Sequence, residues 1–183
     1  MKKIFFVVTL MLTALVSRAQ ITFDVRVGAN VSGIENSDTQ MKWGLKAGAG
    51  IDCSVAKAFS VRPMVFYTSK GSTVGKNNLG FSPDKTMSLD YIQLPVFASY
   101  HFKITNGFML TANAGPYAAY LINKKSTGAV KYNKFDAGIT AGIDFVFNHF
   151  VVGIDAEYGL SSLSSDVDKL HNINYSLAIG FKF

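Results

Sequence analysis

Apolar and polar residues alternate along most of the chain after residue 20, which is the pattern of a β-strand with one apolar face. Trp43 and Leu45, for example, share one face of a segment whose other face carries Lys42 and Lys46. The pattern predicts eight strands of about ten residues each. They are expected at 21–31, 41–53, 59–70, 88–102, 107–122, 135–147, 150–160 and 173–183.

The expected connections alternate between long and short. Long polar connections lie around 32–40, 71–87, 123–133 and 161–172, and short ones around 54–58, 103–106 and 148–149. Long loops at one end and short turns at the other are typical of an outer-membrane barrel. The sequence therefore predicts an all-β fold, an eight-stranded antiparallel up-and-down transmembrane β-barrel.

Aromatic residues gather at both ends of the apolar face. The set expected at the periplasmic end is mostly Phe and includes Phe23, Phe147 and Phe183, whereas the other end carries Trp43, Tyr67, Tyr120, Phe135, Tyr158 and Tyr175. Aliphatic residues lie between, so the apolar face has the double aromatic girdle of a lipid-facing surface. The alternative is a secreted soluble sandwich or ligand-binding barrel, whose apolar face would point inward.

The opposite face carries charges of both signs and many glycines. The lumen of eight strands is just wide enough for side chains to fill it, so these charges are expected to pair. We expect a plug that closes the barrel; the alternative is a narrow path for ions. Asp136 and Lys182 share this face, and the expected charge network is Asp24, Arg26, Lys42, Lys46, Asp52, Arg62, Asp144, Asp155 and Glu157.

The first residues have the features of an export signal. Met1-Lys2-Lys3 is basic, an apolar stretch follows, and Ser17 and Ala19 are small residues before a cut at Gln20. We expect a signal peptide at 1–19 and a barrel domain at 20–183; the alternative is an uncleaved anchor. Cleavage would lower the net charge from +6 to +3 by removing three basic residues, so no nucleic-acid partner is expected.

Pro63, Pro95 and Pro116 fall inside expected strands. Proline cannot donate to a strand ladder, and a closed sheet has no free edge. We therefore expect a β-bulge at each proline.

The mature chain resembles the PorT-like outer-membrane beta-barrel family, often labelled the porin family, which implies the same fold and a bacterial outer-membrane location. It departs from that family at Met64 and Gln93, where the family often has Glu. Phe181 and Phe183 resemble the terminal aromatic signal read by the barrel insertion machinery. The matching stretches are Val27-Gly-Ala-Asn-Val-Ser-Gly33, Gly44-Leu-Lys-Ala-Gly48, Tyr67-Thr-Ser-Lys-Gly71, Leu89-Asp-Tyr-Ile-Gln-Leu-Pro95, Ala114-Gly-Pro-Tyr117, Asp136-Ala-Gly138 and Tyr158-Gly-Leu160.

Residues that carry chemistry are sparse. His101, His149 and His171 are never at metal-ligand spacing from one another, and Cys53 is the single cysteine. Asp155 and Glu157 lie two residues apart, as a catalytic carboxylate pair would, but interior basic residues are the expected partners. We expect no enzyme activity, cofactor or metal site.

Lys124, Lys125, Lys131 and Lys134 form a basic cluster with no acidic residue between 121 and 135. They are expected either to be solvated in a loop or to contact anionic head groups of the outer leaflet. The expected partners are thus outer-membrane lipid and the insertion machinery, with the barrel a monomer. Two functions stay open, a structural or interaction barrel and a narrow porin-like channel for ions or small polar solutes.

Overall fold

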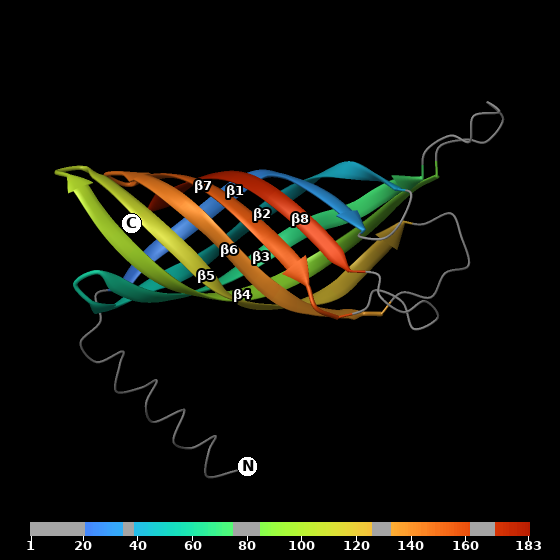
Figure 1. The fold of residues 1–183 in the computed structure, drawn as a ribbon, viewed down its shortest axis with the longest axis horizontal. Coiled ribbons are helices and arrows are strands. Elements are labelled where there is room, and N and C mark those ends of the chain that lie inside the picture. Colours follow the sequence, from blue (N-terminus) through green and yellow to red (C-terminus); the bar gives the residue numbers. More distant parts are fainter. Residues whose placement is uncertain (1–20, 35–38, 75–84, 126–132, 162–170) are drawn as a thin grey trace, which may run out of the picture.

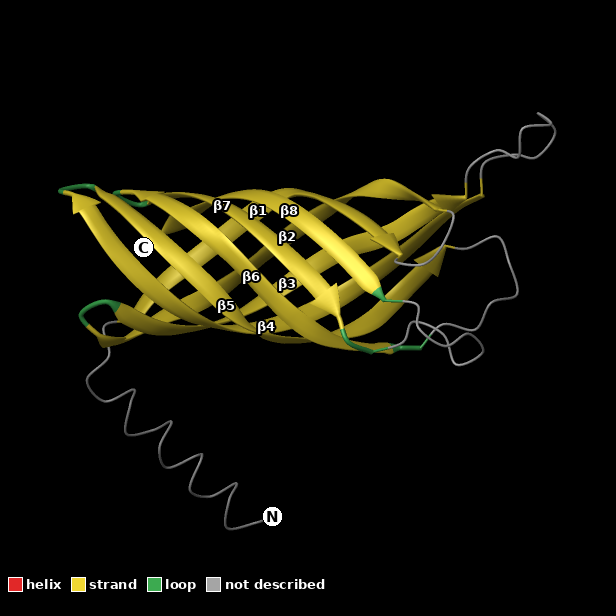
Figure 2. Cartoon of the chain, in the orientation of Figure 1, coloured by secondary structure: helices red, strands yellow, loops and turns green. Residues whose placement is uncertain are grey.

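The computed structural model describes residues 21–34, 39–74, 85–125, 133–161 and 171–183. In this part of the chain every regular element is a strand (Figures 1 and 2). No described helix has the length and hydropathy to cross a membrane. The eight strands are β1 (Ile21–Ile34), β2 (Thr39–Ala56), β3 (Phe59–Val74), β4 (Lys85–Thr105), β5 (Phe108–Lys125), β6 (Phe135–Phe147), β7 (Phe150–Gly159) and β8 (Asn172–Lys182).

The strands form a closed antiparallel barrel in chain order, and β8 pairs with β1 to complete it. At this closure Val25 faces Phe181 and Val27 faces Ile179. The predicted fold, an eight-stranded up-and-down barrel, is confirmed. Closure satisfies the strand ladders internally, which is what a sheet in hydrocarbon requires.

The four strands β2 to β5 are much longer than the expected length of about ten residues. β2 has 18 residues, β3 has 16, β4 has 21 and β5 has 18. Their ends away from the short turns carry polar residues, such as Thr39-Gln40 on β2 and Ser72-Thr73 on β3. The alternation of apolar and polar residues therefore ends before the backbone hydrogen bonding between strands does. A prediction based on alternation underestimates the length of these strands.

The short turns lie together at one end of the barrel, on the left in Figure 1, at Lys57-Ala58, Asn106-Gly107 and Asn148-His149. Gly107 has φ of +95° and Asn148 has φ of +53°, a backbone region that Gly and Asn adopt most readily in tight hairpins. β1 begins and β8 ends at the same end. The strand ends that flank the long connections lie at the opposite end, and most residues of those connections fall outside the described residues.

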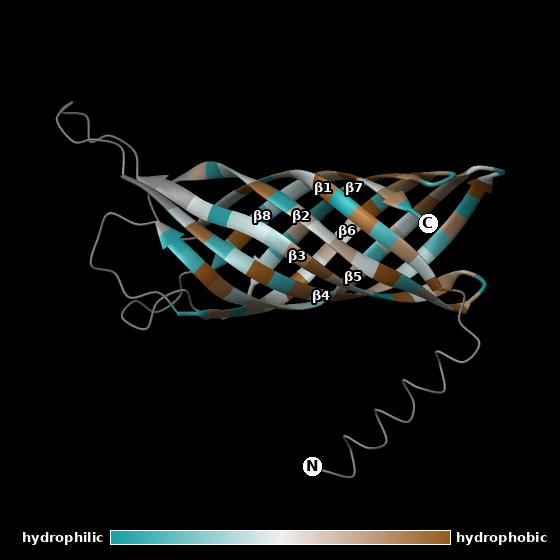
Figure 3. Cartoon of the chain, turned by 180° about the vertical axis from the view of Figure 1, so that it is seen from behind, coloured by the Kyte–Doolittle hydropathy of each residue, from teal (hydrophilic) through white to brown (hydrophobic). Residues whose placement is uncertain are grey.

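The apolar face points outward along every strand, and apolar and polar residues alternate along the ribbons in Figure 3. Phe23 is 60% exposed near the turn end, and Trp43 is 74% exposed toward the other end. Aliphatic residues such as Val27 and Leu177 are exposed between them. An exterior of this kind suits hydrocarbon and not water, which overturns the alternative of a soluble barrel with an apolar interior.

The expected bulges at the prolines are wrong. Pro63 faces Val96 and Phe66 faces Gln93 in a single unbroken register, and Pro95 faces Tyr117 within one register of β4 and β5. The register shifts lie elsewhere, between Met41 and Lys46, Ser54 and Ala56, Asp90 and Tyr91, and Lys103 and Thr105. The chain accommodates the missing N–H groups without inserting a residue.

Candidate functional site in the barrel interior

The inner face is a dense layer of buried polar side chains. Among the described residues, five basic and six acidic side chains are buried there. Three of them, Asp24, Arg62 and Asp144, have no exposed surface. A buried charge is tolerated only when it is paired and hydrogen-bonded, so the arrangement of these groups decides whether the barrel is stable and whether it is open.

One group of ion pairs joins β1, β3 and β6. The Arg26 guanidinium donates to both oxygens of Asp24, at 2.9 and 2.7 Å, and to both oxygens of Asp144, at 2.7 and 2.9 Å. Arg62 donates to Asp144 Oδ2 at 2.7 Å and lies 3.6 Å from Asp24 Oδ2. Two guanidinium groups are thus held between two carboxylates, a group that we call the arginine layer.

A second group centres on Glu157, which projects inward from β7. Its carboxylate lies 2.8 Å from Lys46 Nζ and 3.0 Å from Lys70 Nζ. It also accepts hydrogen bonds of 3.0 Å from the amides of Gln93 and Asn174. Side chains from β2, β3, β4 and β8 therefore converge on one carboxylate; these five residues are called the glutamate layer.

Asp155 lies beside the glutamate layer, and Lys46 joins the two carboxylates because its Nζ is 3.6 Å from Asp155 Oδ2. The Asp155–Glu157 pair considered as a catalytic dyad is thus bridged by a lysine. Basic residues are the partners of these carboxylates, as expected.

Each end of the lumen has further polar contacts. At the turn end Lys182 donates to Asp52 at 2.7 Å, and the His101 ring lies between Ser60 and Thr111. Toward the other end the Asp136 carboxylate accepts hydrogen bonds from Tyr117, Ser161 and Asn172. Polar contacts therefore extend along most of the lumen.

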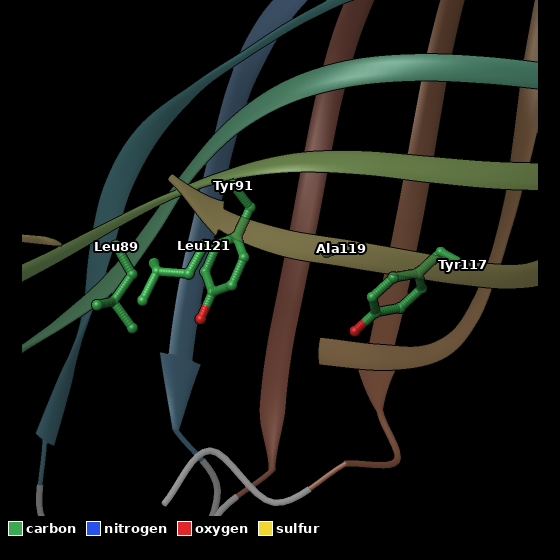
Figure 4. Close-up of a cluster of buried hydrophobic side chains, with 5 residues drawn as sticks. All are labelled: Leu89, Tyr91, Tyr117, Ala119 and Leu121. Atoms are coloured by element: carbon green, nitrogen blue, oxygen red, sulfur yellow. The ribbon is translucent and has the colours of Figure 1, made fainter. Parts of the chain in front are cut away.

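Aromatic rings line the inner face of β3, β4 and β5. Lys46 Nζ lies 4.8 Å from the centre of the Phe66 ring, Arg62 lies 5.2 Å from Phe97, and Lys70 Nζ lies 4.8 Å from Tyr117. The cations thus lie between carboxylates and ring faces that attract them. Figure 4 shows Tyr117 together with Leu89, Tyr91, Ala119 and Leu121, which form a buried apolar cluster on β4 and β5.

Glycines make room for Arg26. A Cβ atom added to Gly153 would lie 2.6 Å from Asp144 Oδ1 and 2.9 Å from Arg26 Nη1, and one added to Gly180 would lie 2.9 Å from Arg26 Cγ. No side chain larger than hydrogen fits at Gly153 unless the ion pair moves. The abundance of glycine on the polar face therefore has a steric cause.

The structure places the expected network on the inner face. Arg26, Lys46 and Arg62 contact Asp24, Asp144, Asp155 and Glu157, whereas Asp52 pairs with Lys182. Lys42 is half-buried on the same face, nearer the long connections.

Sequence reasoning missed Lys70, Gln93 and Asn174, which complete the glutamate layer. It also left Asp136 and Lys182 out of the network. The sequence did contain a signal for Lys70. It is an even number of residues from Arg62 on the same strand, so its side chain must lie on the same face as that of Arg62.

Several buried polar atoms of the lumen have no protein partner. They include Arg62 Nε and Nη2, Asp155 Oδ1, Gln93 Oε1 and Thr140 Oγ1. Buried polar groups of this kind are normally satisfied by water, so the lumen has sites for water around its ion pairs.

The remaining sequence candidates lie at the ends of the barrel. Lys124 and Lys134 are exposed on β5 and just before β6; the side chain of Lys125 and the whole of Lys131 lie outside the described residues, as does the expected signal peptide at 1–19. Phe183 is exposed beside Phe181, with ring centres 5.0 Å apart, and its N–H donates to Phe23 O at 2.9 Å. Their role as an insertion signal stays a prediction. Among the described residues no three His, Cys, Asp or Glu are grouped to hold a metal ion.

The barrel resembles several solved outer-membrane proteins. OprG of Pseudomonas aeruginosa aligns with a TM-score of 0.57 and 12% identity over 90% of this chain and 97% of that chain. Ail of Yersinia pestis, solved with the heparin analogue sucrose octasulfate, gives 0.50 and 16% over 90% and 99%. Neisserial surface protein A gives 0.50 and 13% over 90% and 99%. At these identities the resemblance establishes the fold alone.

No curated protein sequence matches the chain. A family model does, the outer membrane protein beta-barrel domain, over residues 16–165. The match covers most of the chain and agrees with the lipid-facing exterior, while the finer PorT-like assignment stays a prediction. The chain belongs to the outer membrane protein beta-barrel domain family and is a bacterial outer-membrane barrel.

Proposed function

We propose that this protein is a structural or interaction barrel whose interior is closed and whose long connections are displayed at the cell surface. Export through a cleaved signal peptide at 1–19 is part of the proposal, as are a monomeric state and the absence of a cofactor or catalytic role. The observation that carries it is the pair of ion-pair layers across the lumen.

The layers obstruct the lumen because their partners come from strands that are not neighbours. Arg26 on β1 reaches Asp144 on β6, and Lys70 on β3 reaches Glu157 on β7. Such contacts cross the interior, unlike contacts between adjacent strands, which leave the centre free. A hydrated ion could pass only if these contacts opened, and opening them would expose unpaired charges inside the barrel.

A narrow channel is the second candidate, and the unpartnered buried atoms favour it. Water at Arg62 and Asp155 would lie next to both layers. A continuous row of such water molecules would hydrate a small ion along the lumen without any rearrangement of the protein side chains. The structural barrel and the channel thus differ in whether the ion pairs of the two layers continue to block the lumen when a voltage is applied.

Planar-bilayer recordings on the refolded full chain test the proposal. We expect no steady conductance from the unaltered barrel and intermittent openings from Glu157→Ala, because Lys46 and Lys70 then lose their shared partner. Asp90→Ala is the matched control, since Asp90 accepts an exposed hydrogen bond from Asn123 outside both layers. Steady conductance in the unaltered barrel, with Glu157→Ala changing only ion selectivity, would establish the channel instead.

A further inference from the structure

A cavity of about 390 Å³ lies at the turn end of the lumen. Asp52 on β2 and Lys182 on β8 belong to its polar side. Met109 on β5 and Val146 on β6 add apolar surface across the barrel from them, since β5 and β6 lie opposite β1 and β2 in the closed order of strands. We call this cavity the turn-end cup; its volume is that of a small-molecule site, which spans roughly 300–1,000 Å³.

The ion pair in the wall of the cup has hydrogen-bonding capacity to spare. Asp52 and Lys182 are 4% and 7% exposed, and Lys182 Nζ donates to Asp52 Oδ2 at 2.7 Å. Asp52 Oδ1 has no hydrogen-bond partner in the described part of the chain. An ammonium carries three donors, so Lys182 can give a further hydrogen bond. The pair therefore offers an acceptor and a donor side by side to a molecule in the cup.

The rim of the cup is basic. Lys57, exposed in the turn between β2 and β3, lines it together with Asn148 and His149 from the turn between β6 and β7. Apart from Asp52 and the chain end at Phe183, no acidic group lines the cup. A carboxylate that enters thus meets two lysines, of which only Lys182 already has a carboxylate partner.

These groups together define the ligand that would fit. Its carboxylate would lie at Lys57 and Lys182, and its apolar chain would contact Met109 and Val146. A donor on the carbon next to the carboxylate would reach Asp52 Oδ1, because that oxygen lies on the carboxyl group that Lys182 binds. An acid without such a donor would displace water and leave this buried oxygen unpaired, which is costly.

We propose that the turn-end cup binds a small monocarboxylic acid that has a short apolar chain and a hydroxyl or ammonium group next to its carboxylate. In the proposed orientation of the barrel the cup opens to the periplasm. Binding does not depend on whether the lumen conducts, because neither Asp52 nor Lys182 belongs to the arginine layer or the glutamate layer.

Saturation-transfer NMR on the refolded barrel in lipid nanodiscs tests this with three acids of one carbon skeleton. The probes are leucine, its hydroxy analogue leucic acid, and isocaproic acid, which has neither group. Empty nanodiscs correct for partition into lipid. We expect leucine or leucic acid to bind about tenfold more tightly than isocaproic acid, since a hydrogen bond to a charged group contributes that much. Whichever of the two binds more tightly identifies the donor as ammonium or hydroxyl.

Asp52→Asn should reduce this preference to near one. The amide oxygen would stay with Lys182, and the NH₂ group would then face the donor of the ligand. The ratio of two affinities within one variant is compared, so a change in overall stability does not mimic the result.

Ser54→Phe should abolish binding of all three acids, because half-buried Ser54 lines the cup and the ring would fill it. Thr105→Phe is the matched control, since Thr105 is exposed at the same end and does not line the cup. Lys57→Gln should weaken binding by up to about fivefold, as expected for an exposed ion pair. Lys103→Gln should not, because the exposed Lys103 lies outside the cup.

Heat-dependent gel mobility checks that every variant is folded. Equal binding of leucine, leucic acid and isocaproic acid by the unaltered barrel would overturn the proposal, and so would unchanged binding by Ser54→Phe. Neither result bears on the bilayer recordings, which report on the two layers and not on the cup.

Discussion

Arg26 on β1 binds Asp144 on β6 through two parallel hydrogen bonds of 2.7 and 2.9 Å, although two strands, β7 and β8, lie between them around the barrel. Such a two-pronged contact between guanidinium and carboxylate is among the stronger polar interactions in proteins. Arg26 also binds Asp24, so its position is fixed on both sides. The stability of the barrel therefore depends on its interior as well as on its ladders.

Glu157→Ala should lower the free energy of unfolding by about 3–5 kcal/mol, because it leaves Lys46 and Lys70 buried without their shared carboxylate. Urea titration of the protein refolded into lipid vesicles measures the effect. Asp90→Ala should change the free energy by less than about 0.5 kcal/mol, as surface substitutions usually do. Equal midpoints for the two variants would show that the glutamate layer contributes no stability.

Gly153→Ala should destabilise the barrel by about 1–3 kcal/mol, since the new methyl group would push into the Arg26–Asp144 pair. Gly33→Ala is the matched control, because the added Cβ would meet only the flexible Met41 side chain at 3.3 Å. The same urea titration compares them. A larger loss for Gly33→Ala would mean that loss of glycine flexibility, and not the ion pair, governs these positions.

The ion pair at the mouth should be weaker than those inside. Asp52 and Lys182 line a polar cavity of about 390 Å³ at the turn end, where water reaches them. A double-mutant cycle with Asp52→Asn and Lys182→Met should give a coupling energy of about 1 kcal/mol. The cycle with Lys46→Met and Glu157→Gln should give about 2–3 kcal/mol. The reverse order would show that water reaches the glutamate layer more freely than the mouth.

A closed barrel should resist detergent. Unheated and boiled samples are expected to migrate differently on a detergent gel, because the folded ladders have no exposed edge at which unfolding begins. Circular dichroism of the unheated sample should show strand signal. Identical mobility would indicate that the barrel is open or only marginally stable.

Much of the fold was predictable because strand geometry forces alternate side chains to opposite faces. That rule correctly placed Trp43 outside and Lys46 inside before any contact was known. The pattern is weaker on β4, because Tyr91 and Phe97 are apolar residues of the inner face while Leu94 and Val96 are exposed on the outer face, as expected. The ion-pair partners across the lumen could not be predicted. Lys70 and Glu157 are distant in sequence, and the local spacing of residues does not indicate that they are in contact.

The ion pairs between Arg26 and Asp144, and between Lys70 and Glu157, form only when the strands are aligned in the correct register. They therefore make the correctly assembled barrel more stable than a barrel with a shifted strand. Backbone hydrogen bonds are nearly the same when one strand slides past another by two residues, and the apolar exterior tolerates the slide as well. The buried charges do not tolerate the slide, because each cation would then face the wrong neighbour and lose its carboxylate partner inside the barrel. The interior ion pairs thus favour one strand register over its alternatives. Because they join strands across the lumen, they can all form only after β8 has paired with β1 and the barrel has closed.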